Sequence, residues 1–342
     1  MKHRTFFWFI LPSLAAMTLF IALPIVSVFT QSLFVEPEQV IVTTENCGPF
    51  GCEKATSVDV EATQKLRDEQ PLGRFNGLGT YLDRSHLAVA ELGAAWTAST
   101  GWSDFLDQAM NLPFYRALAF TLTYTFLVTP LVILFGLLIA LGVNGLPKAF
   151  RGPTIFVSLL PMIVTPLVGS LILFWMIDAR GIIGSSLQTL MNDPSLSLKA
   201  SPTLTWITLM TYGVWHNAPF AFIVFYAGLQ TVPEETLEAA MIDGASRWER
   251  VRYVVIPYMA PLVVFVALIQ LMDNFRVFEP IVGFSAAANA TSLSYLIYSD
   301  LSGTNARFGS AAATSMLTII GVVVLLSPVL ARTWRDFSRK RV

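Results

Sequence analysis

The sequence predicts an all-α membrane protein with six transmembrane helices and a small extracytoplasmic insert after the first helix. Of its 342 residues, 54% are hydrophobic and only 13% are charged, and the mean hydropathy is positive. The charged residues lie between long apolar runs. A soluble domain carries about twice this share of charge, so the main solvent of this chain is lipid. The net charge of −1 gives no reason to expect a nucleic-acid partner.

Six stretches are long and apolar enough to cross a bilayer, which takes about 20 residues in a helix that satisfies its own backbone hydrogen bonds. We expect the first stretch to be a span and not a cleaved signal peptide, because its apolar part is too long and no small-residue cleavage site follows. The stretches are residues 6–29, 114–143, 153–177, 204–229, 259–284 and 310–330.

Basic residues cluster in every second connection and at both ends of the chain. Cytoplasmic segments are enriched in Lys and Arg, so this pattern places both termini in the cytoplasm of a cell with a bacterial-type inner membrane. The basic residues that set the orientation are Lys2, Arg4, Lys148, Arg151, Arg247, Arg250, Arg252, Arg332, Arg335, Arg339, Lys340 and Arg341.

Residues 33–112 form a long acidic insert that we expect outside the membrane. Its two cysteines, Cys47 and Cys52, flank Gly-Pro-Phe-Gly, a turn-forming sequence. In an oxidising compartment the pair would form a small disulfide loop, and two free thiols are the alternative. No His or further Cys lies nearby, so a metal site is not expected. We expect helix around residues 82–92. The insert either contacts a substrate-delivery protein or only packs on the membrane domain.

The segment between the fourth and fifth apolar stretches predicts two short cytoplasmic helices joined at Gly244. Pro233 suits a first helical turn, and Thr231 or Thr236 is a candidate cap. The small pair Ala239 and Ala240 allows another surface to approach closely. Such a segment is suited to docking in a partner's groove, and an amphipathic linker is the alternative.

This segment resembles the EAA loop of permease subunits of ABC importers. The resemblance rests on Glu238-Ala239-Ala240, on Gly244 after a three-residue gap, and on Val254-Val255-Ile256-Pro257. The family pattern ends in Ile-x-Leu-Pro, so Val254 and Ile256 are conservative departures. Ile242-Asp243-Gly244-Ala245 is similar to the carbohydrate branch of the family. The resemblance covers residue 114 to the C-terminus and weakens across the insert.

The resemblance implies a type I ABC importer permease fold and a translocation subunit that is not itself an enzyme. It also implies two ATP-binding partner subunits that use ATP and Mg, a second homologous permease, and a periplasmic or lipid-anchored solute-binding protein. The chain contains no Gly-x-x-x-x-Gly-Lys-Ser/Thr motif, so no P-loop of its own is expected. The residues that the resemblance implies for coupling to the ATPase are Glu238, Ala239, Ala240, Asp243, Gly244, Ala245 and Pro257.

The predicted organisation is a first transmembrane helix (1–32), a periplasmic insert (33–112), a core permease domain (113–332) with its coupling loop (231–258), and a basic cytoplasmic tail (333–342). The cargo implied by the resemblance is a sugar, oligosaccharide or polyol.

Polar residues in the fifth stretch are candidates for the sugar path, because polar groups inside spans are costly in lipid and mark substrate routes. At 100° per residue, Gln270, Asp273 and Asn274 share one helix face, and Arg276 lies one turn from Asp273. Glu279 completes the set. The alternative is an internal ion pair, Asp273 with Arg276 or Arg276 with Glu279, that only holds helices together.

The fourth stretch contributes Trp215, His216, Asn217 and Phe220 beside Pro219. Aromatic faces suit the apolar side of a pyranose ring, and an amide offers both a donor and an acceptor. In the maltose-type subunit that the chain resembles, corresponding parts of these two spans line the sugar site. Core packing is the alternative role for Trp215 and His216.

Two other classes of protein fit the sequence less well. An ion-coupled secondary transporter would use Asp273, Glu279 and His216 as a relay, but it leaves the EAA-like loop unexplained. A membrane enzyme is disfavoured because the sequence has no serine elbow and no His-Glu-x-x-His pair.

Overall fold

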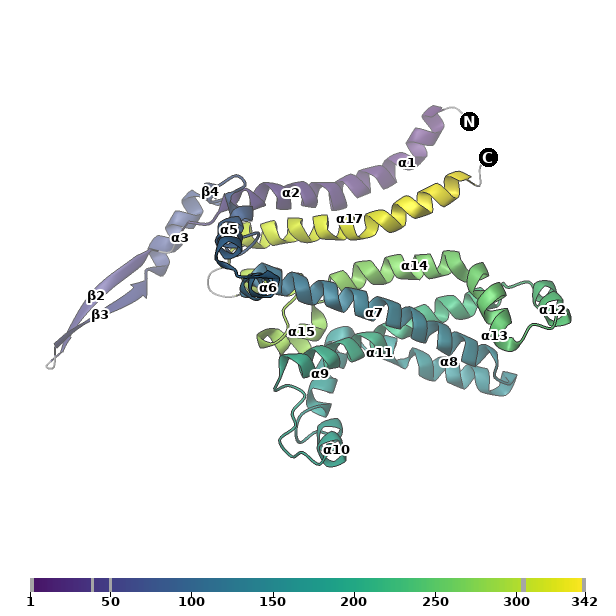
Figure 1. The fold of residues 1–342 in the computed structure, drawn as a ribbon. Helices are drawn as coiled ribbons and strands as arrows, with labels where there is room; N and C mark the ends of the chain where they lie inside the picture. The colour runs from purple at the N-terminus through teal and green to yellow at the C-terminus, as the bar shows by residue number, and fades with distance from the viewer. Residues whose placement is uncertain (1–2, 38–39, 49–50, 303–305, 340–342) are drawn as a thin grey trace. The chain divides into compact units, whose positions relative to one another are not determined.

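The computed structural model describes residues 3–37, 40–48, 51–302 and 306–339, most of them in helices. They fall into two compact units. The first unit comprises Met1–Tyr115 and Leu296–Ile319, and the second comprises Arg116–Tyr295 and Ile320–Val342. Figure 1 shows the helices of both units and the single long hairpin of the insert.

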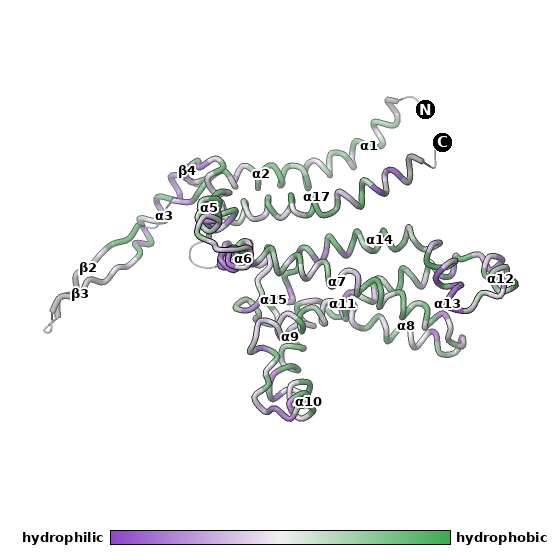
Figure 2. Tube along the Cα trace, viewed as in Figure 1, coloured by the Kyte–Doolittle hydropathy of each residue, from purple (hydrophilic) through white to green (hydrophobic). Residues whose placement is uncertain are grey.

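Within the described residues, four helices are long and apolar enough to cross a membrane, or five if a bent pair counts as one span. The four are Phe6–Ser32, Pro113–Asn144, Arg247–Phe275 and Phe308–Arg332. Figure 2 shows apolar residues along most of α2 (Leu23–Ser32) and α14 (Ile256–Phe275). The protein is therefore a mostly helical membrane protein, as predicted.

Two of these spans contain a π turn just before a proline. Thr18–Ala22 precedes Pro24 between α1 (His3–Met17) and α2, and Val251–Val255 precedes Pro257 at the start of α14. A proline ring clashes with the carbonyl of the residue four positions earlier, and here that residue lies in the wider turn. Pro257 therefore lies inside a continuous helix and does not mark its start, which is at Arg247.

The predicted third span, 153–177, is not one helix. It consists of α8 (Lys148–Ile163) and α9 (Pro166–Met176), which are bent by 93°. Thr165 precedes a proline and is extended, with ψ 144°, because the proline ring disfavours the helical conformation in the residue before it.

The predicted fifth span, 259–284, also ends early. Helix α14 stops at Phe275, and the short helix α15 (Glu279–Gly283) follows. Pro280 has no amide hydrogen to donate to the carbonyl of Arg276, and its ring would clash with that carbonyl in a continuous helix. Arg276 and Glu279 therefore do not lie on the same helix as Asp273.

The second unit has its core around α7 (Pro113–Asn144), α11 (Pro202–Leu229) and α14. Helix α11 covers the predicted fourth stretch and is buried at intervals from Thr205 to Leu229. The largest fully buried side chains include Tyr124 and Phe120 from α7, and Phe222 and Phe225 from α11. Helix α10 (Ile182–Met191) lies in the connection between α9 and α11.

The first unit contains the insert, the apolar helix Phe6–Ser32 and the starts of two other apolar helices. Strand β1 (Phe34–Val35) pairs antiparallel with β4 (Arg74–Phe75), and β2 (Ile41–Gly48) pairs with β3 (Gly51–Val58). Asp59 caps α3 (Val60–Glu69) by accepting from the Ala62 amide at 2.9 Å. The helix expected at 82–92 is instead divided between α4 (Gly79–Leu82) and α5 (Val89–Ala98), and α6 (Trp102–Met110) follows.

Candidate functional site

The loop before α14 is built as two helices joined at a left-handed glycine, as predicted. Helix α12 (Glu234–Ile242) ends at Asp243, and Gly244 has φ +80°. The Gly244 amide donates to the Met241 carbonyl at 3.0 Å, and the Ala245 amide donates to the Ala240 carbonyl at 2.9 Å. These two bonds form a Schellman motif, which needs a residue that tolerates positive φ.

The residues that cap the two helices of this loop are not the predicted ones. The N-cap of α12 is Pro233, and neither Thr231 nor Thr236 caps it by a side chain. The following helix, α13 (Arg247–Arg250), has a full capping box that sequence reasoning missed. The Ser246 amide donates to Glu249 Oε2 at 2.7 Å, and the Glu249 amide donates to Ser246 Oγ at 3.3 Å.

The loop presents apolar side chains just before the Arg247–Phe275 helix and in its first turn. Ile242 is 86% exposed and Trp248 is 65% exposed, and both stand beside charged residues. Among the residues implied for coupling, Ala240 and Ala245 are half-buried, and Glu238, Ala239, Asp243, Gly244 and Pro257 are exposed. The isolated chain therefore leaves this surface uncovered.

Three of the predicted path residues lie in one hydrogen-bonded network between helices. Asn274 Nδ2 donates to Thr129 Oγ1 at 3.0 Å and to Gln270 Oε1 at 3.4 Å. Asn217 Nδ2 donates to Asn274 Oδ1 at 3.4 Å. Gln270 and Asn274 are both buried. The network joins α7, α11 and α14, so these amides satisfy one another in this conformation.

Two other residues of the predicted polar face form an ion pair. Arg276 Nη2 lies 3.0 Å from Asp273 Oδ1, and both side chains are about half exposed. Asp273 is exposed, whereas Gln270 and Asn274 on the same helix are buried. The Asp273–Arg276 ion pair was the predicted alternative to a sugar-binding role. Glu279 is exposed and is not part of this pair.

Trp215 and His216 lie in an aromatic cluster with two residues that sequence reasoning missed. The ring of Tyr212 stacks on His216 with centroids 5.7 Å apart, and it lies 6.0 Å from Trp215 and 5.7 Å from Phe284. Tyr212 lies one turn before His216, so helical spacing was the signal available for it. Phe284 comes from the turn after α15 and had no such signal.

This cluster stands at the bend between α8 and α9. The Tyr212 hydroxyl donates to the Pro166 carbonyl at 2.7 Å, at the first turn of α9. The Ser170 hydroxyl on α9 donates to the Glu279 carbonyl at 3.4 Å, so α15 begins beside α9. His216 Nδ1 is buried without a hydrogen-bond partner in the described structure. The partly exposed ring of Trp215, the buried rings behind it and an unpaired nitrogen of His216 therefore meet where the helix is broken. Phe220, by contrast, packs against the core.

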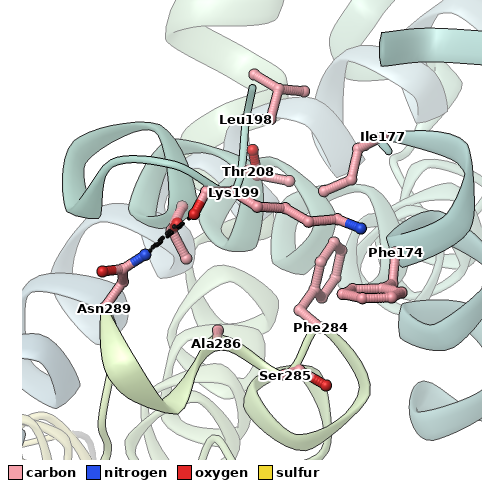
Figure 3. Close-up of a pocket in the computed structure, with 10 residues that line it drawn as sticks. Phe174, Ile177, Leu198, Lys199, Thr208, Phe284, Ser285, Ala286 and Asn289 are labelled. Carbon is pink, nitrogen blue, oxygen red and sulfur yellow. Dashed lines mark hydrogen bonds between the residues drawn. The ribbon is translucent and has the colours of Figure 1, made fainter. Parts of the chain in front are cut away.

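A second polar and aromatic recess in the same unit includes none of the predicted residues (Figure 3). Lys199 Nζ lies 3.3 Å from the centroid of the Phe174 ring and 3.0 Å from Asp178 Oδ2. The Lys199 ammonium, through its hydrogen bond first, and the Arg180 amide hold the pKa of Asp178 below its ordinary value. The lining residues are Phe174, Ile177, Leu198, Lys199, Thr205, Thr208, Phe284, Ser285, Ala286 and Asn289.

Cys47 and Cys52 stand opposite each other in the register of β2 and β3. Opposed residues of an antiparallel pair have Cα atoms about 4.5–5.5 Å apart, which is within the span of a disulfide. Their side chains and the turn residues 49–50 lie outside the described part of the structure, as do Lys2, Lys340 and Arg341. The disulfide stays a prediction.

Comparisons with known proteins agree with this geometry. A family model described as binding-protein-dependent transport system inner membrane component matches residues 105–341. The trehalose transport system permease protein SugA of Mycobacterium tuberculosis is 36% identical over 115 residues, which are 33% of this chain and 38% of that protein's length. The arabinooligosaccharides transport system permease protein AraP of Bacillus subtilis is 29% identical over 241 residues, 66% of this chain and 75% of that protein.

A solved structure has the same fold. It is a chain in the crystal structure of a bacterial ABC transporter involved in the import of the acidic polysaccharide alginate. The TM-score is 0.60 at 21% sequence identity, and the match covers 81% of this chain and 97% of that chain. The likeness shows a shared fold.

Proposed function

Because this chain belongs to the family of binding-protein-dependent transport system inner membrane components, we propose that it forms half of the sugar path in an ATP-driven importer. The cargo is a sugar, oligosaccharide or polyol. The trehalose and arabinooligosaccharide permeases named above support this class of cargo. The proposed partners are a second homologous permease, two ATPase subunits that use ATP and Mg, and a solute-binding protein.

We propose that α11 is a sixth span. Its 28 residues make a helix about 42 Å long, more than the ~30 Å hydrocarbon core requires. It is not one of the four clearly apolar helices, and it is buried at intervals along its length in the core that it shares with α7, α8 and α14. A helix inside a bundle is screened from lipid by its neighbours, so it tolerates polar residues that a lipid-facing helix does not.

The proposed topology places both termini and the α12–α13 loop in the cytoplasm. Arg247, Arg250 and Arg252 lie in or beside this loop, and Arg332 and Arg335 lie at the end of α17 (Phe308–Arg339). The insert carries the acidic residues and belongs on the outer side. The excess of Lys and Arg in cytoplasmic segments supports this orientation.

Coupling to the ATPase is proposed to run through α12 and Gly244. An aqueous loop that exposes Met241, Ile242 and Trp248 leaves apolar surface in water, which is unfavourable unless a partner covers it. The Schellman motif fixes the direction in which the chain leaves α12, so the helix is presented as a rigid knob. The match to the EAA pattern at Glu238, Ala239 and Gly244 supports an ATPase groove as the cover.

The sugar path is proposed to pass the aromatic cluster at the bend of α8 and α9. Trp215 is 46% exposed and offers a ring face to a pyranose, with the buried rings of Tyr212 and Phe284 packed behind it. The exposed Glu279 and the half-buried His216 offer hydrogen-bonding atoms to hydroxyl groups. Asp273 and Arg276 are exposed and remain proposed contacts. Asn217, Gln270 and Asn274 bind one another in this conformation, so they would contact sugar only after the network opens.

The single observation that carries the proposal is the exposed apolar surface on α12, and co-purification tests it. Ile242→Asp is expected to lose the ATPase subunits and ATP-driven uptake, because a carboxylate would be buried in the partner's groove. Leu190→Asp is the matched control: Leu190 is 82% exposed on α10, on the side proposed to be external. Full ATPase recovery with Ile242→Asp, or equal loss with both variants, would contradict the coupling assignment.

A further inference from the structure

A largely exposed apolar stripe runs along α6 in the first unit, and of its residues only Ala109 is buried. Trp102, Phe105, Leu106, Ala109 and Met110 recur at the spacing of one helix face. Trp102 is 71% exposed, Leu106 is 50% exposed and Met110 is 39% exposed. Asp104, Asp107 and Gln108 lie between them in the sequence and form the polar face. Such a helix normally buries its apolar face, so this one needs a cover.

The stripe continues onto α5 through an aromatic cluster. Trp96 on α5 packs edge-on against Trp102 and against Phe105, with centroids 5.3 Å apart in both pairs. Trp96 is itself more than half exposed. We define the aromatic patch as Trp96, Trp102, Phe105, Leu106 and Met110. The rings hold one another in place, so the patch is a fixed apolar surface.

The segment just before α5 is tied to the ends of two apolar helices. The Ser32 and Tyr81 hydroxyls lie 2.6 Å apart, and Ser32 is the last residue of α2. His86 Nε2 lies 3.0 Å from the Ser310 carbonyl in the first turn of α17, and it must donate because a carbonyl only accepts. His86 and Ser32 are fully buried.

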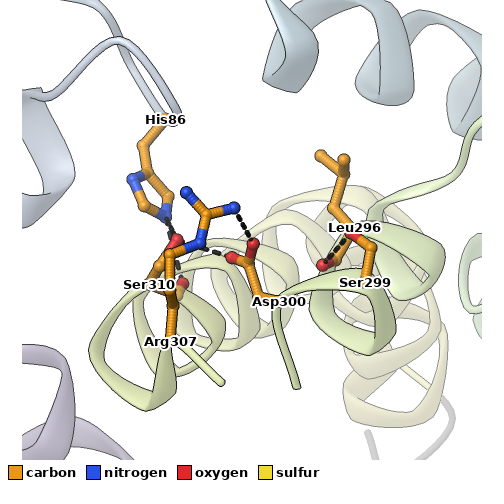
Figure 4. Close-up of polar contacts among 6 residues, drawn as sticks. All are labelled: His86, Leu296, Ser299, Asp300, Arg307 and Ser310. Atoms are coloured by element: carbon orange, nitrogen blue, oxygen red, sulfur yellow. Dashed lines mark hydrogen bonds and ion pairs between the residues drawn. The ribbon is translucent and has the colours of Figure 1, made fainter. Parts of the chain in front are cut away.

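The same helix end is reinforced around Ser310 (Figure 4). Ser310 Oγ donates to Asp300 Oδ2 at 2.5 Å, and Arg307 pairs with Asp300. The Gly309 amide, at the start of α17, donates to Glu36 Oε1 at 2.6 Å. The contacts of Tyr81 and His86 therefore hold residues 81–87 at the level where α2 ends and α17 begins.

The other end of the helical pair is tied to a third apolar helix. Helix α6 ends at Met110 and α7 begins at Pro113. Tyr115, in the first turn of α7, donates its hydroxyl to the Leu87 carbonyl at 2.8 Å. Helices α5 and α6 therefore start and finish at the boundary where three apolar helices meet water, and each is only about 15 Å long or less.

From this placement we propose that the aromatic patch is inserted into the headgroup region of the bilayer. Tryptophan and other aromatic residues are favoured at this depth, because the ring is apolar while the indole N–H stays hydrated. An amphipathic helix lies in this plane with its apolar face inward. The polar face is acidic, so apolar burial and not attraction to anionic lipid provides the binding. The assignment to the outer leaflet depends on the topology proposed above. The insertion into the headgroup region does not depend on it.

Lipid quenching at paired positions tests the proposal. In a Cys47→Ser, Cys52→Ser background, Leu106→Cys and its neighbour on the polar face, Asp107→Cys, are labelled with an environment-sensitive fluorophore. The complete importer is reconstituted in phosphatidylethanolamine and phosphatidylglycerol vesicles with or without lipids spin-labelled near the headgroup. Quenching by these lipids is expected to be several-fold stronger at position 106 than at 107, and quenching by aqueous iodide is expected to show the reverse order.

Met110→Cys and Gln108→Cys form a second pair with the same expected contrast, should the first pair give poorly folded protein. Equal iodide quenching on both faces would overturn the proposal, because the patch would then lie in water. Protection of position 106 from both iodide and spin-labelled lipid would also overturn it, because a protein would then cover the patch. Neither outcome depends on which solute is carried or on the ATPase contact.

Discussion

Gly136 on α7 lies against Ala221 on α11 with no room for a side chain between them. A Cβ atom on Gly136 would lie 2.5 Å from the Cβ of Ala221 and 2.9 Å from the amide nitrogen of Phe222. Both obstacles belong to a helix backbone or are attached directly to it, so no side-chain rotation relieves them. Small residues at such crossings let helices in lipid approach closely enough to gain dispersion energy.

Gly136→Ala is therefore expected to separate α7 from α11 and to cost about 1–3 kcal/mol of stability. Gly142→Ala is the matched control in the same helix, because nothing lies within 4 Å of a Cβ built there. The control is expected to be neutral or to stabilise by up to about 1 kcal/mol, the helix propensity difference. Thermal unfolding of the purified protein in detergent compares the two. Equal stability of the variants would show that the helices adjust freely.

Gly244→Ala is expected to loosen the end of α12. A residue with a Cβ at φ +80° costs about 1 kcal/mol, and Gly244 has no neighbour within 4 Å, so strain of the backbone is the whole cost. Gly244→Asn is the control, because Asn tolerates this conformation better. ATPase recovered with the purified protein should fall in the order Gly, Asn, Ala. Recovery with Ala equal to that with Gly would mean that the Schellman turn does not matter for docking.

Asn274→Ala and Glu279→Gln are expected to separate a structural role from a transport role. Removing Asn274 leaves Thr129, Gln270 and Asn217 without this partner, at about 1–3 kcal/mol for each buried group left unsatisfied. Glu279 is exposed, so Glu279→Gln should leave the melting temperature unchanged and lower uptake. Uptake in vesicles and thermal unfolding give the two readouts. Unchanged uptake by a well-folded Glu279→Gln protein would remove Glu279 from the path.

The Lys199–Asp178 pair is expected to make stability depend on pH in the acid range. Because Lys199 holds the folded pKa of Asp178 below its ordinary value of 3.8, the pair contributes above that value. The contribution is lost as the pH falls through the lower, folded pKa. The melting-temperature gap between wild type and Lys199→Gln should therefore be constant above about pH 5 and narrow toward pH 3. A gap that widens on acidification would refute the sign.

Cys47 and Cys52 are expected to resist maleimide until a reductant is added. Their opposed places in the hairpin bring the backbones within the span of a disulfide. Cys47→Ser should leave Cys52 reactive without reduction, which shows that the site is accessible to the reagent. Labelling of the unreduced wild-type protein would mean two free thiols.

Local patterns predicted the helices well where only local physics was involved. The stretch 114–143 became α7 within one residue at each end, and Gly244 joins two helices as expected. Within the predicted spans the errors came at prolines: Pro166 breaks the third span and Pro280 follows the early end of the fifth. Each proline was visible in the sequence, but spans often tolerate proline, and whether one does depends on how neighbouring groups satisfy the freed carbonyls.

Only part of the candidate site could be predicted from local sequence patterns. Periodicity placed Gln270 and Asn274 on one face, but it could not say that Thr129 and Asn217 would satisfy them from other helices. Tyr212 could have been predicted from its helical spacing to His216. Phe284 contacts the cluster only because of the turn after α15, which no local pattern predicts.

The sequence by itself determined that this is a membrane protein, that most of its apolar segments are helices, and that an exposed loop carries an EAA-like pattern. Hydropathy, proline and glycine act over a few residues, so a linear reading captures them. Only the tertiary structure decided the 93° bend, the approach of Gly136 to Ala221 and the gathering of Tyr212, His216 and Phe284. Those features depend on which helix faces meet, and contacts between residues distant in the chain leave no local periodicity to read.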